Sequence, residues 1–193
     1  MKIALYGGAF NPPHYGHLIT IESVREQLRF DKVLFVPSSH PPNKMAASLA
    51  PAEARLEMTR LAIQDAPEFE TCDIEVRRRG ISYTVDTIRT LMEERPGDSF
   101  SLIIGSDNLL EFQTWKSPTD ILARVQLIVM NRPGFPPTQA RADYARLATV
   151  VSVPQIGIAS TEIRRRVKLH RSIRYLVPPA VELYIRRAGL YHE

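Results

Sequence analysis

Short, continuous apolar runs alternate with amphipathic stretches along the chain. The apolar runs lie at residues 2–6, 32–36, 100–104 and 125–130. Runs of this length without polar alternation are typical of strands that are buried on both faces, as in a parallel sheet. Between them, apolar residues recur at helical spacing, which predicts two helices with the apolar faces Ala54, Met58, Leu61, Ala62 and Val85, Ile88, Leu91, Met92.

A further amphipathic stretch predicts a helix near residue 185. It carries Val181, Tyr184, Ile185 and Ala188, begins at Pro178-Pro179 and ends at Gly189. The alternation of strands and helices over most of the length indicates an α/β fold. We therefore expect residues 1–193 to form a single doubly wound, Rossmann-like domain with a mostly parallel sheet and a small helical C-terminal part.

Two proline-rich segments, residues 37–51 and 132–138, interrupt this alternation. Long irregular loops in a compact α/β domain usually face a substrate. We expect both segments to be lids over a ligand site rather than spacers between domains.

The composition excludes several classes of protein. No apolar run approaches the roughly 20 residues that a bilayer-spanning helix needs, so we expect no membrane-spanning segment. The first apolar stretch ends at Gly7, which is too early for a secretory signal. The single cysteine, Cys72, excludes an internal disulfide framework and predicts a cytoplasmic location. The net charge of +4 suits either an enzyme of anionic nucleotides or a nucleic-acid-binding module.

The first predicted strand runs directly into the segment GGAFNPPHYGHL at residues 7–18. Glycines allow a tight turn and close approach of the backbone to a ligand. We expect a helix to begin near Tyr15, so that its first amide N–H groups and its positive dipole end face the carboxyl edge of the sheet. His14 and His17 are three residues apart and therefore share one face of that first turn. This combination favours a phosphate site.

A structural role, a zinc site and a Walker loop fit these residues less well than a phosphate site does. A lone histidine near a helix start is mostly structural, but here two spaced histidines follow a buried strand and a glycine turn. A zinc site is disfavoured because helical zinc pairs prefer the i, i+4 spacing and no third ligand is near. A Walker loop would need a Gly-Lys-Ser/Thr sequence after the glycines, which residues 7–18 lack.

The pattern Gly-Gly-x-Phe-Asn-Pro-x-His-x-Gly-His-Leu resembles the signature of the nucleotidyltransferase superfamily, whose His-x-Gly-His element binds the triphosphate of ATP. Four further segments, residues 37–44, 81–87, 105–116 and 160–164, follow in the order seen in the bacterial nicotinate-nucleotide adenylyltransferase family. The resemblance covers essentially the whole chain. One departure is that many members have Thr-Phe-Asp at positions 9–11, where this chain has Ala-Phe-Asn, which weakens any contact assigned to the side chains of Ala9 and Asn11.

The resemblance implies a reaction of ATP with nicotinate mononucleotide that gives nicotinate adenine dinucleotide and pyrophosphate. It implies Mg²⁺ bound with ATP, no metal ligand from the protein and no nucleic-acid partner, and it leaves the oligomeric state open. The implied catalytic residues are His14, His17, Lys44 and Arg164. The implied ATP-binding residues are Gly8, Ala9, Phe10, His14, His17, Gly105, Asp107, Ser160, Thr161 and Arg164. The implied residues for the mononucleotide are Gly7, Gly8, Ser39, Lys44, Ser82, Tyr83, Thr84, Trp115, Lys116 and Arg132.

Several of these residues also have a physical interpretation. Ser160 or Thr161 is a good N-cap for a helix that continues through Arg164, and Arg164 lies on the same face as both hydroxyls. The next two arginines, at 165 and 166, then face solvent because helical residues step by about 100°. Thr84 is the expected N-cap of the helix that begins near Val85.

For two residues the alternatives stay open. Asp107 either accepts hydrogen bonds from ATP or caps a helix over residues 108–112. Trp115 is the only tryptophan and on composition alone is a core residue, whereas the resemblance implies that it stacks on the pyridine ring. The arginine runs at residues 77–79 and 186–187 are interpreted as solvated charge.

Three functions therefore compete. An adenylyltransferase for nicotinate mononucleotide is favoured, and enzymes that use nicotinamide mononucleotide or pantetheine phosphate are the nearest alternatives. A basic nucleic-acid-binding module is the alternative from a different class. Salt dependence of binding distinguishes the last from the others.

Overall fold

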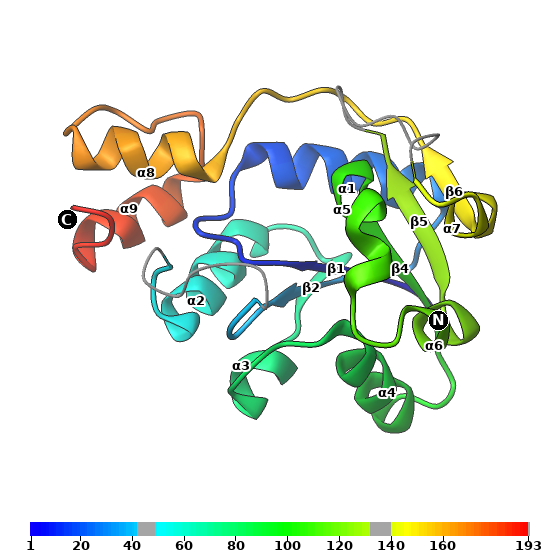
Figure 1. The fold of residues 1–193 in the computed structure, drawn as a ribbon. Coiled ribbons are helices and arrows are strands. Elements are labelled where there is room, and N and C mark those ends of the chain that lie inside the picture. The colour runs from blue at the N-terminus through cyan, green and yellow to red at the C-terminus, as the bar shows by residue number, and fades with distance from the viewer. Residues whose placement is uncertain (42–48, 132–139, 193) are drawn as a thin grey trace.

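The structure is a computed structural model that describes residues 1–41, 49–131 and 140–192 (Figure 1). Within these residues, six strands alternate with helices along the chain. In chain order the elements are β1 (Lys2–Gly8), α1 (Tyr15–Leu28), β2 (Lys32–Pro37), α2 (Ala52–Ile63), β3 (Phe69–Thr71), α3 (Ile74–Arg78), α4 (Thr84–Glu94), β4 (Ser99–Gly105), α5 (Ser106–Glu111), the 3₁₀ turn η2 (Phe112–Thr114), α6 (Pro118–Arg124), β5 (Gln126–Met130), α7 (Ala142–Leu147), β6 (Ala148–Val151), α8 (Ser160–Lys168) and α9 (Pro179–Arg187).

The strands form one sheet in the order β3-β2-β1-β4-β5-β6, and every neighbouring pair is parallel. All four strands predicted from the apolar runs are present within a few residues of the predicted bounds. The strand order reverses between β1 and β4. In an open α/β sheet, ligands bind at such a switch point, outside the carboxyl ends of the strands.

Side chains of β1 point alternately to the two faces of the sheet. Ile3 and Leu5 belong to an apolar cluster that includes the apolar side of α4, whereas Ala4 and Tyr6 belong to a second cluster that includes α1. Figure 1 shows α1 and α4 on opposite faces of the sheet. This arrangement confirms the predicted doubly wound α/β fold.

A third apolar cluster lies outside the sheet and joins α8 and α9 to α2. Its fully buried members are Met58, Ile163 and Val181. The predicted small helical C-terminal part is therefore present and rests on α2. Helix α9 ends at Arg187, and Gly189, the glycine predicted to end it, follows two residues later with φ +61. The amides of Gly189 and Leu190 close the end of the helix on the carbonyls of Arg186 and Ile185, which is the Schellman arrangement.

Two predicted N-cap positions were wrong by one or two residues, and the capping alternative for Asp107 is excluded. The N-cap position of α4 is Tyr83 rather than Thr84, and that of α8 is Ala159 rather than Ser160 or Thr161. Asp107 lies in the first turn of α5, so it does not cap a helix over residues 108–112. At α8 the reason is visible, because the Ser160 hydroxyl donates instead to the carbonyl of Pro12 at 2.9 Å.

Candidate active site

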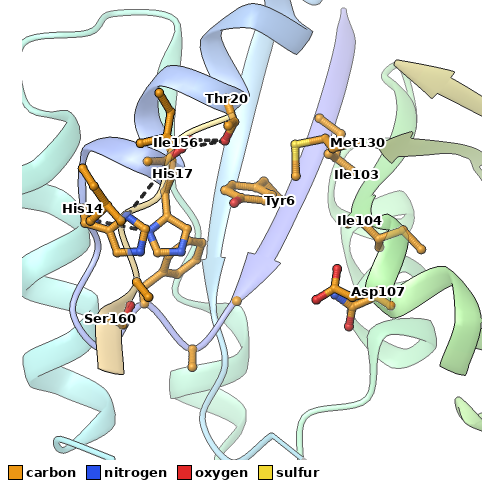
Figure 2. A pocket seen from close by; sticks show the side chains of 18 of the residues that line it. Tyr6, His14, His17, Thr20, Ile103, Ile104, Asp107, Met130, Ile156 and Ser160 are labelled. Atoms are coloured by element: carbon orange, nitrogen blue, oxygen red, sulfur yellow. Dashed lines mark hydrogen bonds between the residues drawn. The ribbon is translucent and has the colours of Figure 1, made fainter. Parts of the chain in front are cut away.

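A cavity of about 610 Å³ opens at the carboxyl ends of β1 and β4, at the switch point of the sheet. Parts of the chain that are far apart in sequence line it, among them the β1–α1 loop with the start of α1, the β4–α5 junction, and the start of α8. The lining includes the predicted residues Gly7, Gly8, Ala9, Phe10, His14, His17, Gly105, Asp107, Trp115, Ser160, Thr161 and Arg164. Figure 2 shows the two histidines at one end of the cavity, near Ser160, and Asp107 across from them.

His14 and His17 cap the first turn of α1 reciprocally. His14 is the N-cap residue, and its Nδ1 accepts a hydrogen bond from the backbone N–H of His17 at 3.4 Å. The Nδ1 of His17 in turn accepts from the backbone N–H of His14 at 3.2 Å. The two rings stack with a centroid distance of 3.7 Å. The pair thus forms a capping box made of imidazoles instead of a hydroxyl and a carboxylate.

This capping fixes the tautomer of both rings. An Nδ1 that accepts a backbone hydrogen bond carries no proton, so the neutral imidazole carries its proton on Nε2. Each ring of His14 and His17 therefore presents an N–H donor on the side away from its own helix turn. Two adjacent donors beside a helix N-terminus suit the oxygens of a phosphate.

Aromatic and glycine residues support the histidine pair. The ring of Phe10 packs edge-on against that of His17 at 5.3 Å and against that of Tyr6 at 5.6 Å. A Cβ on Gly16 would lie 3.0 Å from Nδ1 of His14, and one on Gly8 would lie 3.1 Å from the Phe10 ring. The glycines at 8 and 16 therefore leave the space that these rings occupy.

Arg164 joins α8 to the same end of the cavity. Its guanidinium donates to the carbonyl of Asn11 at 2.9 Å and lies 3.4 Å from the Thr161 hydroxyl. Arg165 pairs instead with Glu162 at 2.7 Å, and Arg166 donates to the carbonyl of Ser172. Of these three arginines, Arg164 alone lines the cavity, as its helical position predicts.

Trp115 and Lys116 lie near the start of α4. The indole is half-buried, packs on Phe112 at 5.2 Å and lines the cavity. The ammonium of Lys116 lies 4.5 Å from the Tyr83 ring centroid and 2.9 Å from the Asp86 carboxylate. These contacts bring residues 115–116 beside the 83–86 segment, which includes Thr84 at the start of α4.

Ser39 and Ser82 lie in a buried hydrogen-bond chain rather than on the cavity wall. The amide of Ser39 donates to the Ser82 hydroxyl at 2.9 Å, and the Thr87 hydroxyl donates to the Glu75 carboxylate at 2.7 Å. Burial raises the pKa of Glu75, and hydrogen bonds from Thr87 and Ser82 oppose that rise. Arg78 donates to the same Thr87 hydroxyl, so it is more than the solvated charge that we predicted, although its residue is exposed.

Lys44 and Arg132 lie outside the described residues, as do residues 42–48 of the first predicted lid and all of the second.

Sequence reasoning missed three contributors to the site. Residues 153–156 and 158–159, between β6 and α8, line the cavity. The Tyr191 hydroxyl donates to Oδ1 of Asn11 at 2.8 Å, and burial raises the pKa of this phenol. Arg55 of α2 is only 1% exposed and donates to carbonyls of the loops beside the cavity. No local pattern marks these residues, because each acts on a partner far away in sequence.

Asn11 does not cap α1, although its short side chain suits an N-cap. Its Oδ1 accepts from the Ala50 amide at 3.1 Å as well as from Tyr191. The departure from aspartate at this position therefore affects an anchoring contact of the loop.

Two structural features are absent from the residues described. In those parts of the chain, no group of three or more His, Cys, Asp or Glu side chains is arranged to hold a metal ion. Nor does any helix in the described ranges have the length and apolar character to cross a membrane.

Comparisons with known proteins show the family. Residues 5–166 match the model of the family described as cytidylyltransferase-like. A curated protein of Salinibacter ruber, named "Probable nicotinate-nucleotide adenylyltransferase", is 42% identical over 191 residues, which cover 99% of this chain and 98% of the relative. A protein of the same name from Thermus thermophilus is 44% identical, with 99% of this chain and 100% of the relative covered.

Solved structures share the fold. The nicotinic acid mononucleotide adenylyltransferase of Plasmodium falciparum, complexed with NaAD, superposes with a TM-score of 0.80 at 19% sequence identity and covers 99% of this chain and 97% of its own. The complex of that protein with APC gives a TM-score of 0.78 over the same shares of the two chains.

Proposed function

The chain belongs to the nicotinate-nucleotide adenylyltransferase family, and from this premise we propose that it transfers the adenylyl group of ATP to nicotinate mononucleotide. The products are nicotinate adenine dinucleotide and pyrophosphate. The observation that carries the proposal is one continuous cavity that reaches from the histidine pair and Arg164 to Asp107 and Trp115. It offers cationic and N–H donors at one end and an aromatic ring at the other.

The acceptor supplies its own nucleophile. The phosphate of the mononucleotide is mostly dianionic at neutral pH, because its second pKa is about 6. One of its oxygens forms a bond to the α-phosphorus of ATP while the bond from that phosphorus to the bridging oxygen of pyrophosphate breaks. No proton has to be removed, so the reaction needs no general base.

Catalysis then depends on holding two anions in line and on stabilising the charge that develops on the leaving group. We assign the triphosphate to the Nε2–H groups of His14 and His17, the start of α8 with Ser160 and Thr161, and Arg164. The main chain at Gly8, Ala9, Phe10 and Gly105 borders the same space, and Asp107 is placed to accept hydrogen bonds from the ribose or the base.

We assign the mononucleotide to the part of the cavity near Trp115, whose indole stacks on the pyridine ring. Backbone N–H groups near Thr84 and Lys116 receive the ring carboxylate, since N–H donors bind a carboxylate more strongly than a neutral amide oxygen. The main chain at Gly7 and Gly8 borders its phosphate. Ser39, Ser82 and Tyr83 support this wall, and Lys44 and Arg132 are proposed as further cations.

Mg²⁺ fits this site as a partner of ATP. Asp107 is the sole carboxylate among the described cavity residues, and Mg²⁺ often uses one or two carboxylates, several waters and substrate phosphates. We therefore propose that the triphosphate carries the ion, with Asp107 as the nearest protein carboxylate. When bound, the ion neutralises charge on the phosphates.

We also propose a single nucleotidyltransferase domain in the cytoplasm. The contact of Tyr191 with Asn11 supports one domain, because it joins two residues that are 180 positions apart in sequence. A single cysteine in the sequence supports the reducing compartment.

A pyrophosphate-release assay tests the proposal. The enzyme is supplied with Mg-ATP and, separately, nicotinate mononucleotide, nicotinamide mononucleotide or pantetheine phosphate. We expect kcat/KM for the nicotinate substrate to exceed that for the amide by at least about tenfold, the scale of a charge-assisted hydrogen bond. Absence of pyrophosphate release with nicotinate mononucleotide would refute the proposal. Tight, strongly salt-dependent binding of nucleic acid would favour the binding module instead.

A further inference from the structure

The carbonyl oxygens of the β1–α1 loop are held by donors from other elements. The carbonyl of Gly8 accepts from the Ser38 amide at 2.9 Å, and that of Ala9 accepts from Arg55 at 2.9 Å. The carbonyls of Asn11 and Pro12 accept from Arg164 and Ser160 of α8. A carbonyl oxygen carries partial negative charge and repels a phosphate. This loop borders an anion site, and its four carbonyl oxygens accept hydrogen bonds from other elements of the protein.

Arg55 is the most extensively connected of these donors. Besides the Ala9 carbonyl, its guanidinium donates to the carbonyls of Ser38 at 2.6 Å, Ser39 at 2.8 Å and Ala50 at 2.9 Å. One planar side chain thus ties together the β1–α1 loop, the end of β2 and the start of α2. Burial lowers the pKa of Arg55, yet an arginine with four carbonyl partners keeps its charge in a protein.

The hydrogen bonds to the Gly8 and Ala9 carbonyls also fix the direction of the backbone N–H groups that follow them. In a trans peptide the C=O of one residue and the N–H of the next point in opposite directions. With the Ala9 carbonyl held on Arg55, the Phe10 N–H points away from α2. With the Gly8 carbonyl held on Ser38, the Ala9 N–H points away from β2. Ala9 and Phe10 both line the cavity.

Backbone strain marks the same point. Phe10 adopts φ 45, in the left-handed region that residues with a Cβ avoid. Such a conformation persists only where the surroundings fix it. Here the Phe10 ring is buried beside Tyr6 and Phe35, and the peptide before it is fixed by Arg55.

We propose that Arg55 is a positioning residue for the anion site: it ties the Ala9 carbonyl to the Ser38–Ser39 segment and holds that carbonyl turned away from the cavity, so that the Phe10 amide hydrogen faces the substrate phosphates. It contacts no substrate itself. The inference rests on the proposed function only in that it names the ligand as a polyphosphate.

Arg55→Lys tests this role, because lysine keeps the charge but lacks the planar fork that reaches four carbonyls. The probes are inorganic pyrophosphate, measured by calorimetry, and the KM values for ATP and nicotinate mononucleotide. We expect the Kd for pyrophosphate and the KM for ATP to rise by about tenfold to a hundredfold, the range for losing charge-assisted hydrogen bonds. Arg55→Gln, which also loses the charge, is expected to weaken binding further.

Ile63→Ala is the matched control for stability. Ile63 is buried on the same helix and is not among the residues that line the cavity. This variant should lower the thermal midpoint and leave the Kd for pyrophosphate unchanged. If Ile63→Ala changed the Kd for pyrophosphate as much as Arg55→Lys does, both changes would be due to general destabilisation. That result would overturn the proposal.

Three further outcomes would also count against the positioning role of Arg55 or against the proposed function. Wild-type binding of pyrophosphate by Arg55→Lys, with loss only in Arg55→Gln, would show that the charge of Arg55 matters and its hydrogen bonds do not, which overturns the positioning role. Failure of both variants to fold would make Arg55 a stability residue, against the proposal. If the wild-type protein binds neither pyrophosphate nor ATP, the proposed function itself fails, which separates the two questions.

Discussion

At the first turn of α1, one imidazole serves both as a helix cap and as a phosphate ligand in the proposed site. The Nδ1 of His14 accepts a backbone hydrogen bond, and its Nε2–H is the donor assigned to ATP. The two roles use different atoms of the same ring, so a substitution can remove one role and keep the other.

Asparagine at position 14 should separate these roles. His14→Asn keeps a side-chain acceptor that is among the best N-caps, so we expect the free energy of unfolding in urea to stay close to wild type. His14→Ala should lose about 1 kcal/mol of that free energy. Both should lower kcat by about 10²–10³, the range for one preorganised donor. Wild-type turnover of folded His14→Asn would contradict the phosphate assignment.

Glu75 should make the free energy of unfolding depend on pH, and replacement of Glu75 by a neutral residue should remove this dependence. Its pKa in the folded protein lies above the ordinary value of 4.5, because burial disfavours the carboxylate. The folded state therefore binds more protons than the unfolded state between the two values. The contribution of Glu75 to the free energy of unfolding then falls as pH rises through this window.

The comparison of wild type with Glu75→Gln isolates this effect. The difference in free energy of unfolding, variant minus wild type, should increase as pH rises from about 4.5 through the raised pKa, and level off above it. Urea denaturation at a series of pH values measures it. A difference that is flat with pH, or that decreases, would show that the hydrogen bonds from Thr87 and Ser82 outweigh burial.

At this scale the sequence predicts residues with a local signature and misses those without one. The histidine spacing and the glycines before it are visible in the sequence, and the structure places them at one cavity. Arg55 lies beside the apolar face of Ala54 and Met58, where an arginine is expected at the surface. Its burial depends on carbonyls of residues 9, 38 and 39, which no pattern within its own helix reveals.

At the scale of single elements, helix α9 depends on its C-terminal turn. Gly189 adopts φ +61, and a Cβ there would meet no atom within 4 Å. Gly189→Ala should therefore cost about 1 kcal/mol of unfolding free energy from backbone conformation alone. Gly97→Ala is the control, since Gly97 has equal space around it and no positive φ. Equal stability of the two variants in urea would contradict this account of the α9 terminus.

The central strands could be predicted and the edge strands could not. Burial on both faces gives β1, β2, β4 and β5 their continuous apolar runs. β3 and β6 are shorter, are partly exposed and pair on one side within the described sheet, so their sequences carry polar residues such as Glu70 and Thr149. The start of α8 was also misplaced because of a contact distant in sequence. The Ser160 hydroxyl donates to the carbonyl of Pro12 instead of capping its own helix turn.

At the scale of the whole molecule, the cavity joins elements from β1 to α8, so ligand binding should stabilise the entire chain. ATP at about one hundred times its Kd should add about 2.7 kcal/mol to the free energy of unfolding. Thermal denaturation with and without ATP measures the gain. Gly189→Ala is the control, because it should lower the midpoint while the increment from ATP stays the same. No shift with saturating ATP would contradict the assignment of the cavity.

The hydrogen bond from Tyr191 to Asn11 has a consequence for biosynthesis. On the ribosome, every strand of the described sheet is made before the tyrosine that anchors the β1–α1 loop. A nascent chain that ends at residue 151 would hold the full set of described strands, with that loop still lacking its anchor. The β1–α1 loop is therefore made long before the side chain that anchors it, and the site is completed only after Tyr191 has been synthesised.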